Sequence, residues 1–245
     1  MSESINKLLL ITRSGMLARL TDLDVVSNNI SNINTTGYKS TRSNFQELFE
    51  SQLYNGTQLR ATQRIFDQGS LVQTSNELDL AIQGDGFFGV TLPDGRIAYT
   101  RDGTFSLDSD RRLVTAQGFP VVWDGTIPED ATDLVVNKDG SVMAKQGDVW
   151  NQLGTIQLNR FINPLGLLNN GNNLLLESEV SGPVQTGASN SEGYGQIFNH
   201  TLEASNVNLA NEVTQMVILQ RSFQLSLRAF QQTDLMLSQA ISMRR

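Results

Sequence analysis

The sequence contains no cysteine and only one histidine in 245 residues. The absence of cysteine excludes disulfide frameworks, thiol nucleophiles and cysteine-based zinc sites. A lone histidine, His200, excludes a multi-histidine metal site within one chain. No apolar run approaches the roughly 20 residues that a membrane span needs. The first ten residues do not resemble a cleavable secretory signal, which by itself favours the cytoplasm. We therefore predict no cofactor, no metal site and no membrane insertion.

Basic side chains are in deficit, with 18 Lys and Arg against 25 Asp and Glu and a net charge of −7. The imbalance is confined to the middle of the chain, where residues 76–204 carry seven basic and 17 acidic side chains. Broad nucleic-acid binding needs a basic face, so this distribution argues against it. A solvated acidic surface is the simplest interpretation.

Both ends of the chain carry an apolar repeat with alternating steps of four and three residues. Such a repeat predicts a helix with a seam that packs against another helix. We predict long helices over about 4–31 and from 209 onward, and we interpret the repeat positions as assembly seams. The N-terminal seam consists of Ile5, Leu9, Met16, Leu23 and Ile30. The C-terminal seam consists of Leu209, Val213, Met216, Gln220, Phe223, Leu227, Phe230, Leu237 and Ile241.

Further apolar residues of the C-terminal segment, among them Ile218, Leu225 and Leu235, lie off this seam. One partner helix cannot cover so wide a face, so we expect contacts with neighbouring copies. A closed hairpin of the two helices, capping the middle of the chain, stays open as the alternative. Gly15 lies inside the first predicted helix, where it either permits close helix approach or is a tolerated defect.

The middle of the chain alternates short β-prone runs with Asp-Gly turns, such as 87–90, 97–100 and 134–136. Glycine after aspartate supplies the positive φ of tight hairpin turns, which indicates an all-β region. The predicted fold class is α+β, with long N- and C-terminal helices pairing into a coiled-coil-like core domain and a mainly-β middle domain inserted between them. The predicted ranges are 1–34 with 205–245 for the helical core, 35–75 for a linker arm with a short helix near 43–53, and 76–204 for the β-rich middle domain with a return linker.

Motifs that could carry chemistry are weak. The run Gly84-Asp85-Gly86 has the wrong spacing for a nucleotide loop, so a β-turn is the better interpretation. The acidic loops do not match a calcium-binding loop. His200 lies in a predicted last strand over 197–202, where a structural role is favoured. We predict no catalytic, cofactor-binding or metal-binding residue, and hence no enzyme.

Several blocks resemble the bacterial flagellar rod and hook proteins. The block Val26–Lys39 is similar to the motif that ends their first helix, and Ser205–Asn208 is similar to their C-terminal motif. Leu78–Phe88 and Tyr99–Gly103 match the start of their middle domain. The motif positions are Asn28, Asn29, Asn32, Thr36, Gly37, Ser205, Asn206, Val207 and Asn208. The distal rod class is nearest, while a short arm between Phe45 and Ala61 leaves the proximal rod class open.

This resemblance implies a structural axial subunit of the flagellar basal-body rod. It implies export through the flagellar type III apparatus without a cleaved signal, and polymerisation into a hollow helical drive shaft that crosses the periplasm and passes torque from motor to hook. The implied partners are copies of the chain, neighbouring rod and hook subunits, and the export apparatus. The implied arrangement places the helices around a central channel and the β domain outside. The alternative from another class is a β-domain binding module dimerised by its helices.

Overall fold

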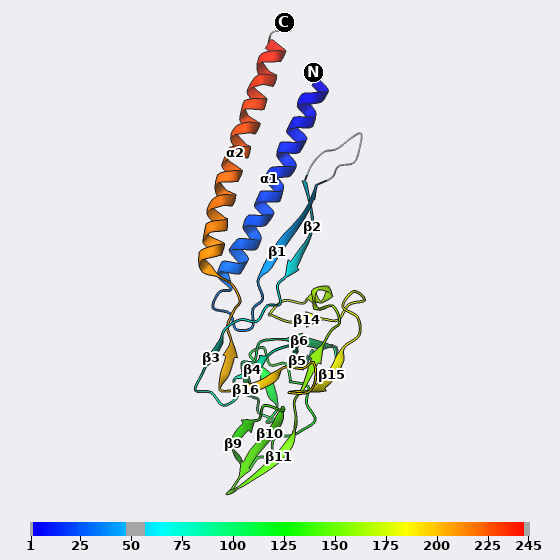
Figure 1. Cartoon of the computed structure of the whole chain (residues 1–245), viewed down its shortest axis with the longest axis vertical. Coiled ribbons are helices and arrows are strands. Elements are labelled where there is room, and N and C mark those ends of the chain that lie inside the picture. Colours follow the sequence, from blue (N-terminus) through cyan, green and yellow to red (C-terminus); the bar gives the residue numbers. More distant parts are fainter. Residues whose placement is uncertain (1, 48–56, 243–245) are drawn as a thin grey trace. The chain divides into compact units, whose positions relative to one another are not determined.

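The computed structural model describes residues 2–47 and 57–242, and the chain divides into two units (Figure 1). The terminal unit comprises residues 1–33, 40–65 and 207–245, and the β unit comprises residues 34–39 and 66–206. The chain therefore passes from one unit to the other four times.

The terminal unit contains two long helices, α1 (Ser2–Ser31) and α2 (Leu209–Ser242). They run side by side in opposite directions and pack against each other (Figure 1). The strands β1 (Thr41–Glu47) and β2 (Thr57–Arg64) form an antiparallel hairpin that packs on α1. The terminal unit is thus built from two helices and a hairpin.

Polar side chains begin α2 and connect α1 to the hairpin. The Asn208 side chain accepts a hydrogen bond from the Asn211 amide at 3.1 Å, which satisfies one free N–H of the first turn of α2. Buried Asn29 bonds the backbone of Thr41 twice, because its Nδ2 donates to the carbonyl and its Oδ1 accepts from the amide, each at 2.9 Å. Asn29 therefore acts as a short strand partner for the start of β1.

The predicted short helix over 43–53 is wrong where the structure describes it. Residues 43–47 belong to β1 and pair with β2, while 48–53 lie outside the described residues. The helical spacing of Phe45, Leu48 and Phe49 was outweighed by strand pairing, which satisfies the backbone across the hairpin.

The predicted coiled-coil-like pairing of the terminal helices is also wrong. The α2 side chains with least exposure are Leu219 at 2% and Thr233 at 8%, and neither belongs to the predicted seam. A coiled coil needs apolar side chains at both alternating positions of its seam. Here polar side chains also lie on the covered face, such as half-buried Ser226, whose hydroxyl bonds to the carbonyl of Ser222 in the same helix at 3.0 Å. The covered face of α2 therefore coincides with only part of the predicted seam.

The β unit contains short strands and one turn of 3₁₀ helix, η1 (Pro164–Gly166). The strands are β3 (Leu71–Gln73), β4 (Leu80–Gln83), β5 (Phe88–Thr91), β6 (Ile97–Thr100), β7 (Phe105–Leu107), β8 (Leu113–Thr115), β9 (Ala131–Val136), β10 (Ser141–Gln146), β11 (Val149–Thr155), β12 (Gln157–Arg160), β13 (Leu168–Asn169), β14 (Leu175–Leu176), β15 (Gln185–Ala188), β16 (Gln196–Asn199) and β17 (Thr201–Glu203). They form small antiparallel sheets, of which β13-β14-β6-β5 and β11-β10-β9 are the larger.

The end of the β unit pairs with its beginning. Strand β16 pairs with β4 and β17 pairs with β3, both antiparallel. The predicted single last strand over 197–202 is instead two strands separated at His200, whose φ of 50° cannot continue a strand. Strand β15 lies inside the predicted return linker.

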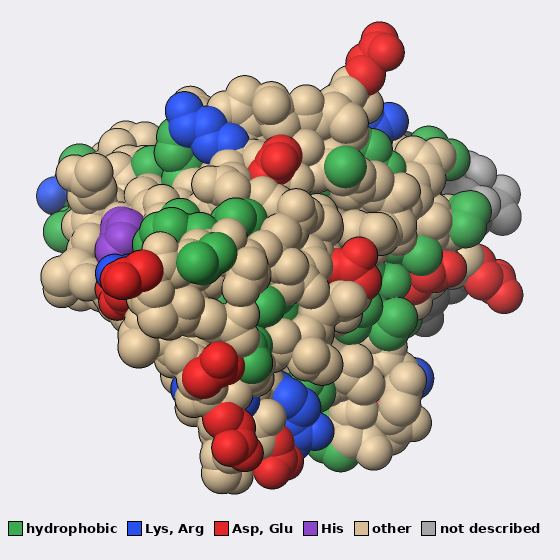
Figure 2. All heavy atoms as spheres, turned by 90° about the horizontal axis from the view of Figure 1, so that it is seen from below, with side chains coloured by type: hydrophobic (Ala, Val, Ile, Leu, Met, Phe, Trp, Pro, Cys, Tyr) green, Lys and Arg blue, Asp and Glu red, His purple; other side chains and the backbone are tan. Residues whose placement is uncertain are grey.

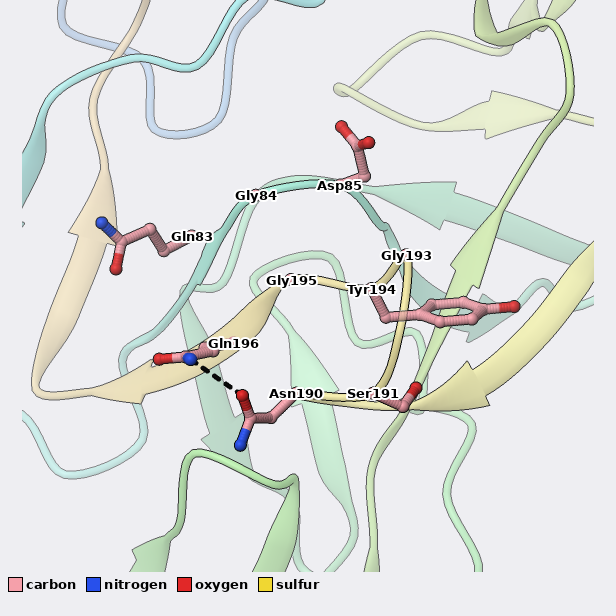
Figure 3. Close-up of a pocket in the computed structure, with 9 residues that line it drawn as sticks. All are labelled: Gln83, Gly84, Asp85, Asn190, Ser191, Gly193, Tyr194, Gly195 and Gln196. Carbon is pink, nitrogen blue, oxygen red and sulfur yellow. Dashed lines mark hydrogen bonds between the residues drawn. The ribbon is translucent and has the colours of Figure 1, made fainter.

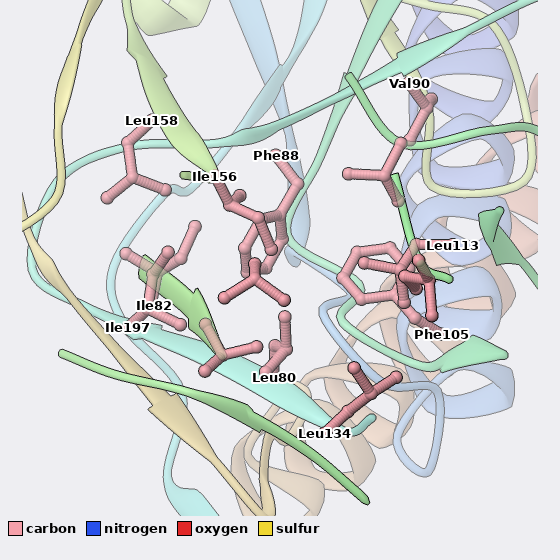
Figure 4. Packing of buried hydrophobic residues seen from close by; sticks show 14 of the residues in the cluster. Leu80, Ile82, Phe88, Val90, Phe105, Leu113, Leu134, Ile156, Leu158 and Ile197 are labelled. Atoms are coloured by element: carbon pink, nitrogen blue, oxygen red, sulfur yellow. The ribbon is translucent and has the colours of Figure 1, made fainter. Parts of the chain in front are cut away.

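Two apolar clusters lie in the β unit, a large one (Figure 4) and a smaller one that consists of Phe87, Tyr99, Phe161 and Leu175. In the large cluster, Phe88, Ile156 and Ile197 come from three different strands or strand ends and are fully buried. The rings of Phe88 and Phe105 meet edge to face with centroids 5.2 Å apart. Strands β4, β5 and β8 are buried along most or all of their length, so they lie inside the unit rather than at its surface.

Candidate functional site

Helix α2 carries a broad apolar surface that α1 does not cover. Its large apolar side chains remain between 40% and 64% exposed. These are Leu209, Val213, Val217, Ile218, Leu225, Leu227, Leu235 and Met236. We call this set the α2 apolar surface. Exposed apolar areas of this kind mark interaction sites, because soluble proteins rarely leave them in water.

The predicted seam residues divide between two environments. Met216, Phe223 and Phe230 of α2 are half-buried, as are Met16, Leu23 and Ile30 of α1. Leu209, Val213, Gln220 and Leu227 are exposed. The side chains of Ile5, Leu9, Leu237 and Ile241 lie outside the description.

A second feature, this one polar, lies in the β unit, where three charged side chains are buried together. Glu203 is 0% exposed, and its carboxylate accepts hydrogen bonds from Lys39 Nζ at 2.6 Å and from Arg101 Nη1 at 3.4 Å. The side chains of Lys39 and Arg101 are 3% and 7% exposed. Arg101 also donates to the carbonyl of Gly84 at 2.8 Å, and its guanidinium lies 5.2 Å from the ring centroid of Phe87.

Burial and pairing act against each other in this cluster. Desolvation lowers the pKa of Lys39 and of Arg101, and the negative charge of Glu203 opposes both changes. Removing the carboxylate would leave two buried cations without their counter-charge, which is the costly case for a buried ion pair.

Figure 3 shows an open hollow of the β unit of about 390 Å³, lined by residues such as Asp85, Asn190, Tyr194 and Gln196. Gln196 donates to Asn190 at 2.8 Å, whereas the side chains of Asp85 and Tyr194 point away from that pair. The nine lining residues include one carboxylate, so no pair of carboxylates is available there for acid–base chemistry.

In the part of the chain that the structure describes, no group of three or more His, Asp and Glu side chains is placed to hold a metal ion. Neither described helix combines the length and apolarity required to cross a bilayer.

Three family models match the chain in order. Residues 9–39 match the flagella basal body rod protein model, 81–144 the flagellar hook protein FlgE/F/G D1 domain, and 199–243 the flagellar basal body rod FlgEFG protein C-terminal model.

Full-length relatives agree with these models. The flagellar basal-body rod protein FlgG of Borreliella burgdorferi is 40% identical, over 95% of this chain and 96% of the relative. The FlgG protein of Caulobacter vibrioides is 36% identical over 94% and 97%, and that of Bacillus subtilis is 34% identical over 95% and 97%. The chain belongs to the FlgG family of flagellar basal-body rod proteins.

Membership of the FlgG family confirms the resemblance to rod and hook proteins and the nearer distal rod class. The chain is a structural subunit of the rod and not an enzyme, because that is the nature of this family.

The structure brings several motif positions of this FlgG-family chain together in the β unit. The Gly37 amide donates to the carbonyl of Glu203 at 2.7 Å, and Asn173 Nδ2 donates to the carbonyl of Thr36 at 3.1 Å. Asn206 Nδ2 donates to the carbonyl of Asp67 at 3.0 Å. Asn29 and Asn208 serve the terminal unit, as described above. The Asn206 amide also donates to the carbonyl of Tyr38 at 3.4 Å, so the C-terminal motif lies beside the block Val26–Lys39.

Sequence reasoning missed the buried cluster. Lys39 stood at the end of one quoted block and Arg101 in the middle of another, and Glu203 preceded the C-terminal motif by two residues. Charged residues inside blocks that carry a family resemblance were the available signal. Net charge gave no signal, because it sums all charged side chains, and Figure 2 shows acidic and basic side chains together on one face of the molecule.

Proposed function

We propose that this chain polymerises with copies of itself into a hollow helical rod, and that the rod is a drive shaft that passes torque from the motor to the hook. The observation that carries this proposal is the α2 apolar surface, because the single chain leaves it in water. Two different surfaces must meet in a helical polymer, so the contact is heterologous and does not close into a ring. Membership of the FlgG family supports it.

The finer parts of the proposal concern placement and neighbours. We propose that the rod spans the periplasm and contacts other rod and hook subunits at its ends. We propose that the subunit reaches this place through the flagellar type III export apparatus without cleavage of a signal. The family of the chain supports these statements.

The seam residues of α2 differ in exposure, and this difference supports two kinds of contact. We propose that Met216, Phe223 and Phe230 hold α2 against α1, while Leu209, Val213 and Leu227 contact neighbouring copies. On α1, the half-buried seam residue Met16 is assigned to the first group.

A pair of matched variants tests the α2 apolar surface. Leu225→Asp with Leu227→Asp places two charges where neighbouring copies would bury two leucines, so we expect filament assembly to stop. The control, Gln224→Asp with Gln231→Asp, adds the same charge at exposed polar positions of α2 and should assemble. Electron microscopy of purified chain and swimming of the complemented strain measure the result.

Two results would contradict the proposed function. If the leucine variant still builds rods that support motility, the α2 apolar surface is not the assembly contact. If light scattering shows that the unaltered chain forms a closed dimer and stops there, it is not a polymer subunit.

A further inference from the structure

The buried cluster of Lys39, Arg101 and Glu203 has no part in the proposed assembly surface. All three residues belong to the β unit. Two of them lie close to points where the chain leaves that unit, because Lys39 precedes a crossing directly and Glu203 stands three residues before the last one. We call the three side chains the charge clasp.

One carboxylate binds segments that adjoin different crossings. Glu203 accepts from Lys39 Nζ at 2.6 Å and from the Gly69 amide at 2.8 Å. Lys39 Nζ also donates to the carbonyl of Asp67 at 2.8 Å. The clasp therefore joins the ends of three stretches, namely 34–39, the chain just after residue 66, and the chain just before residue 206.

Backbone bonds run beside the clasp and join the same stretches. The Gly37 amide donates to the carbonyl of Glu203 at 2.7 Å, and the Ala204 amide donates to the carbonyl of Ser70 at 2.9 Å. Gly69 packs so closely on the carbonyl of Ala204 that a β-carbon would not fit there. The junction is thus tight as well as charged.

Stability alone does not explain why three charged side chains are buried together. Desolvating three charges costs free energy that their attraction only partly returns, and well-packed apolar residues often stabilise as much. Arg101 Nε is buried without a hydrogen-bond partner, which adds to the cost. What the charges add is a specific connection, because an ion pair with bonded partners tolerates only one arrangement of its segments.

We propose that the charge clasp is the mechanical joint of the subunit: it binds together the chain segments through which force enters and leaves the β unit. Force that travels along the chain between the units does so at the four crossings, and the clasp shares tension on one crossing among the others. The inference rests on the proposed drive-shaft function and names the residues that transmit its load inside one subunit.

Hydrogen exchange of the full-length monomer tests the joint directly. Lys39→Met keeps the Arg101–Glu203 pair but frees segment 34–39, so we expect exchange at the Gly37 and Gly69 amides to rise about tenfold or more. The β5 amides should keep their protection. Glu203→Gln leaves two cations unpaired, and we expect a rise on the order of a hundredfold at the same two glycines. Glu179→Gln, an exposed substitution of the same kind in the same unit, is the control and should change neither.

The pattern of exchange distinguishes a clasp that joins particular segments from a cluster that only stabilises the whole β unit. If Lys39→Met raises exchange equally at Gly37 and in β5, the cluster only adds to global stability and the proposal fails. It fails as well if neither site changes. If Glu203→Gln does not fold, the decision rests on Lys39→Met alone.

Rotation of tethered cells at low and high load tests the mechanical role. With Lys39→Met as the only copy, we expect rods in normal number, normal speed at low load, and reduced speed at high load. If the variant turns at the speed of the unaltered strain at both loads, the charge clasp is not the joint, and the proposed drive-shaft function is unaffected. A strain that lacks the chain and still turns its flagellum would overturn the proposed function itself.

Discussion

The two units of this chain differ in how far their apolar side chains are buried. The β unit buries Phe88, Ile156 and Ile197 completely in its large core cluster, although surface side chains such as Ile162 stay exposed. The terminal unit leaves Leu225 and Met236 of α2 more than half exposed. The same chain therefore contains one unit with a large buried core and one with a long helix on which many apolar side chains are exposed. Composition averaged over the sequence hides this difference, because both units contribute to the 39% apolar content.

The largest expected effect lies in the core of the β unit. Phe88→Ala removes a fully buried ring and should lower the free energy of unfolding by about 3–5 kcal/mol. Leu225→Ala in α2 removes a side chain that is 64% exposed and should change it by less than about 0.5 kcal/mol. Both tryptophans, Trp123 and Trp150, lie in the β unit, so their fluorescence in urea measures its unfolding, while the helical circular dichroism signal in urea measures the unfolding of the terminal unit. Similar losses for both variants would remove the contrast between the units.

Glycine substitutions in the two units are expected to change stability by an intermediate amount. Gly37 of the β unit has a φ of 66°, and a β-carbon there would lie 2.5 Å from the Asp102 amide nitrogen. We expect Gly37→Ala to destabilise the β unit by more than about 2 kcal/mol, through backbone strain and contact with backbone atoms that cannot move away.

Gly15 of α1 has open space around it, because a β-carbon added there would meet no neighbouring segment within 4 Å. Gly15→Ala should therefore stabilise the helix by about 1 kcal/mol, since alanine is the better helix former. The helical circular dichroism signal during heating measures it. Destabilisation by Gly15→Ala would show that a neighbour approaches α1 there.

The smallest expected effect depends on pH. Burial raises the pKa of the Asp102 carboxyl above its ordinary value of 3.8. Between the two values the folded chain binds more protons than the unfolded chain, so the free energy of unfolding falls as pH rises through this window and stays reduced above it. Asp102→Asn cannot ionise, and Asn can still accept the bond from the Thr104 amide.

The stability advantage of Asp102→Asn should therefore grow as pH is raised from about 3.8 toward neutrality. Urea midpoints followed by tryptophan fluorescence at several pH values measure it. Asp24→Asn, exposed on α1, controls for the loss of one negative charge. An advantage that shrinks with rising pH would contradict the assignment.

Both long helices and the β-rich middle could be predicted from the sequence because their signals are local. The repeat near 3.5 residues predicted α1 and α2, and the Asp-Gly turns predicted the hairpins around residues 95 and 140. The family resemblance was predicted from ordered blocks. Asn208, one of the motif positions, lies at the start of α2 in the structure.

What failed depended on contacts distant in sequence. Residues 43–47 became a strand because β2 lies opposite them. The less exposed residues of α2, among them Leu219, Ser226 and Thr233, do not coincide with its most apolar face, because packing of α2 with α1 and not composition sets which face is covered. The apolar repeat shows that a helix has an apolar side, but the segment that packs against the helix determines which side is covered.

The sequence by itself determined the kinds of element, their order and the family of this chain, because propensity, turn chemistry and motif order are written in neighbouring residues. Only the tertiary structure decided that Lys39, Arg101 and Glu203 meet, since 164 positions of chain separate the first from the last. Buried charge is unfavourable at each position taken alone, and it becomes tolerable only where folding supplies the partner.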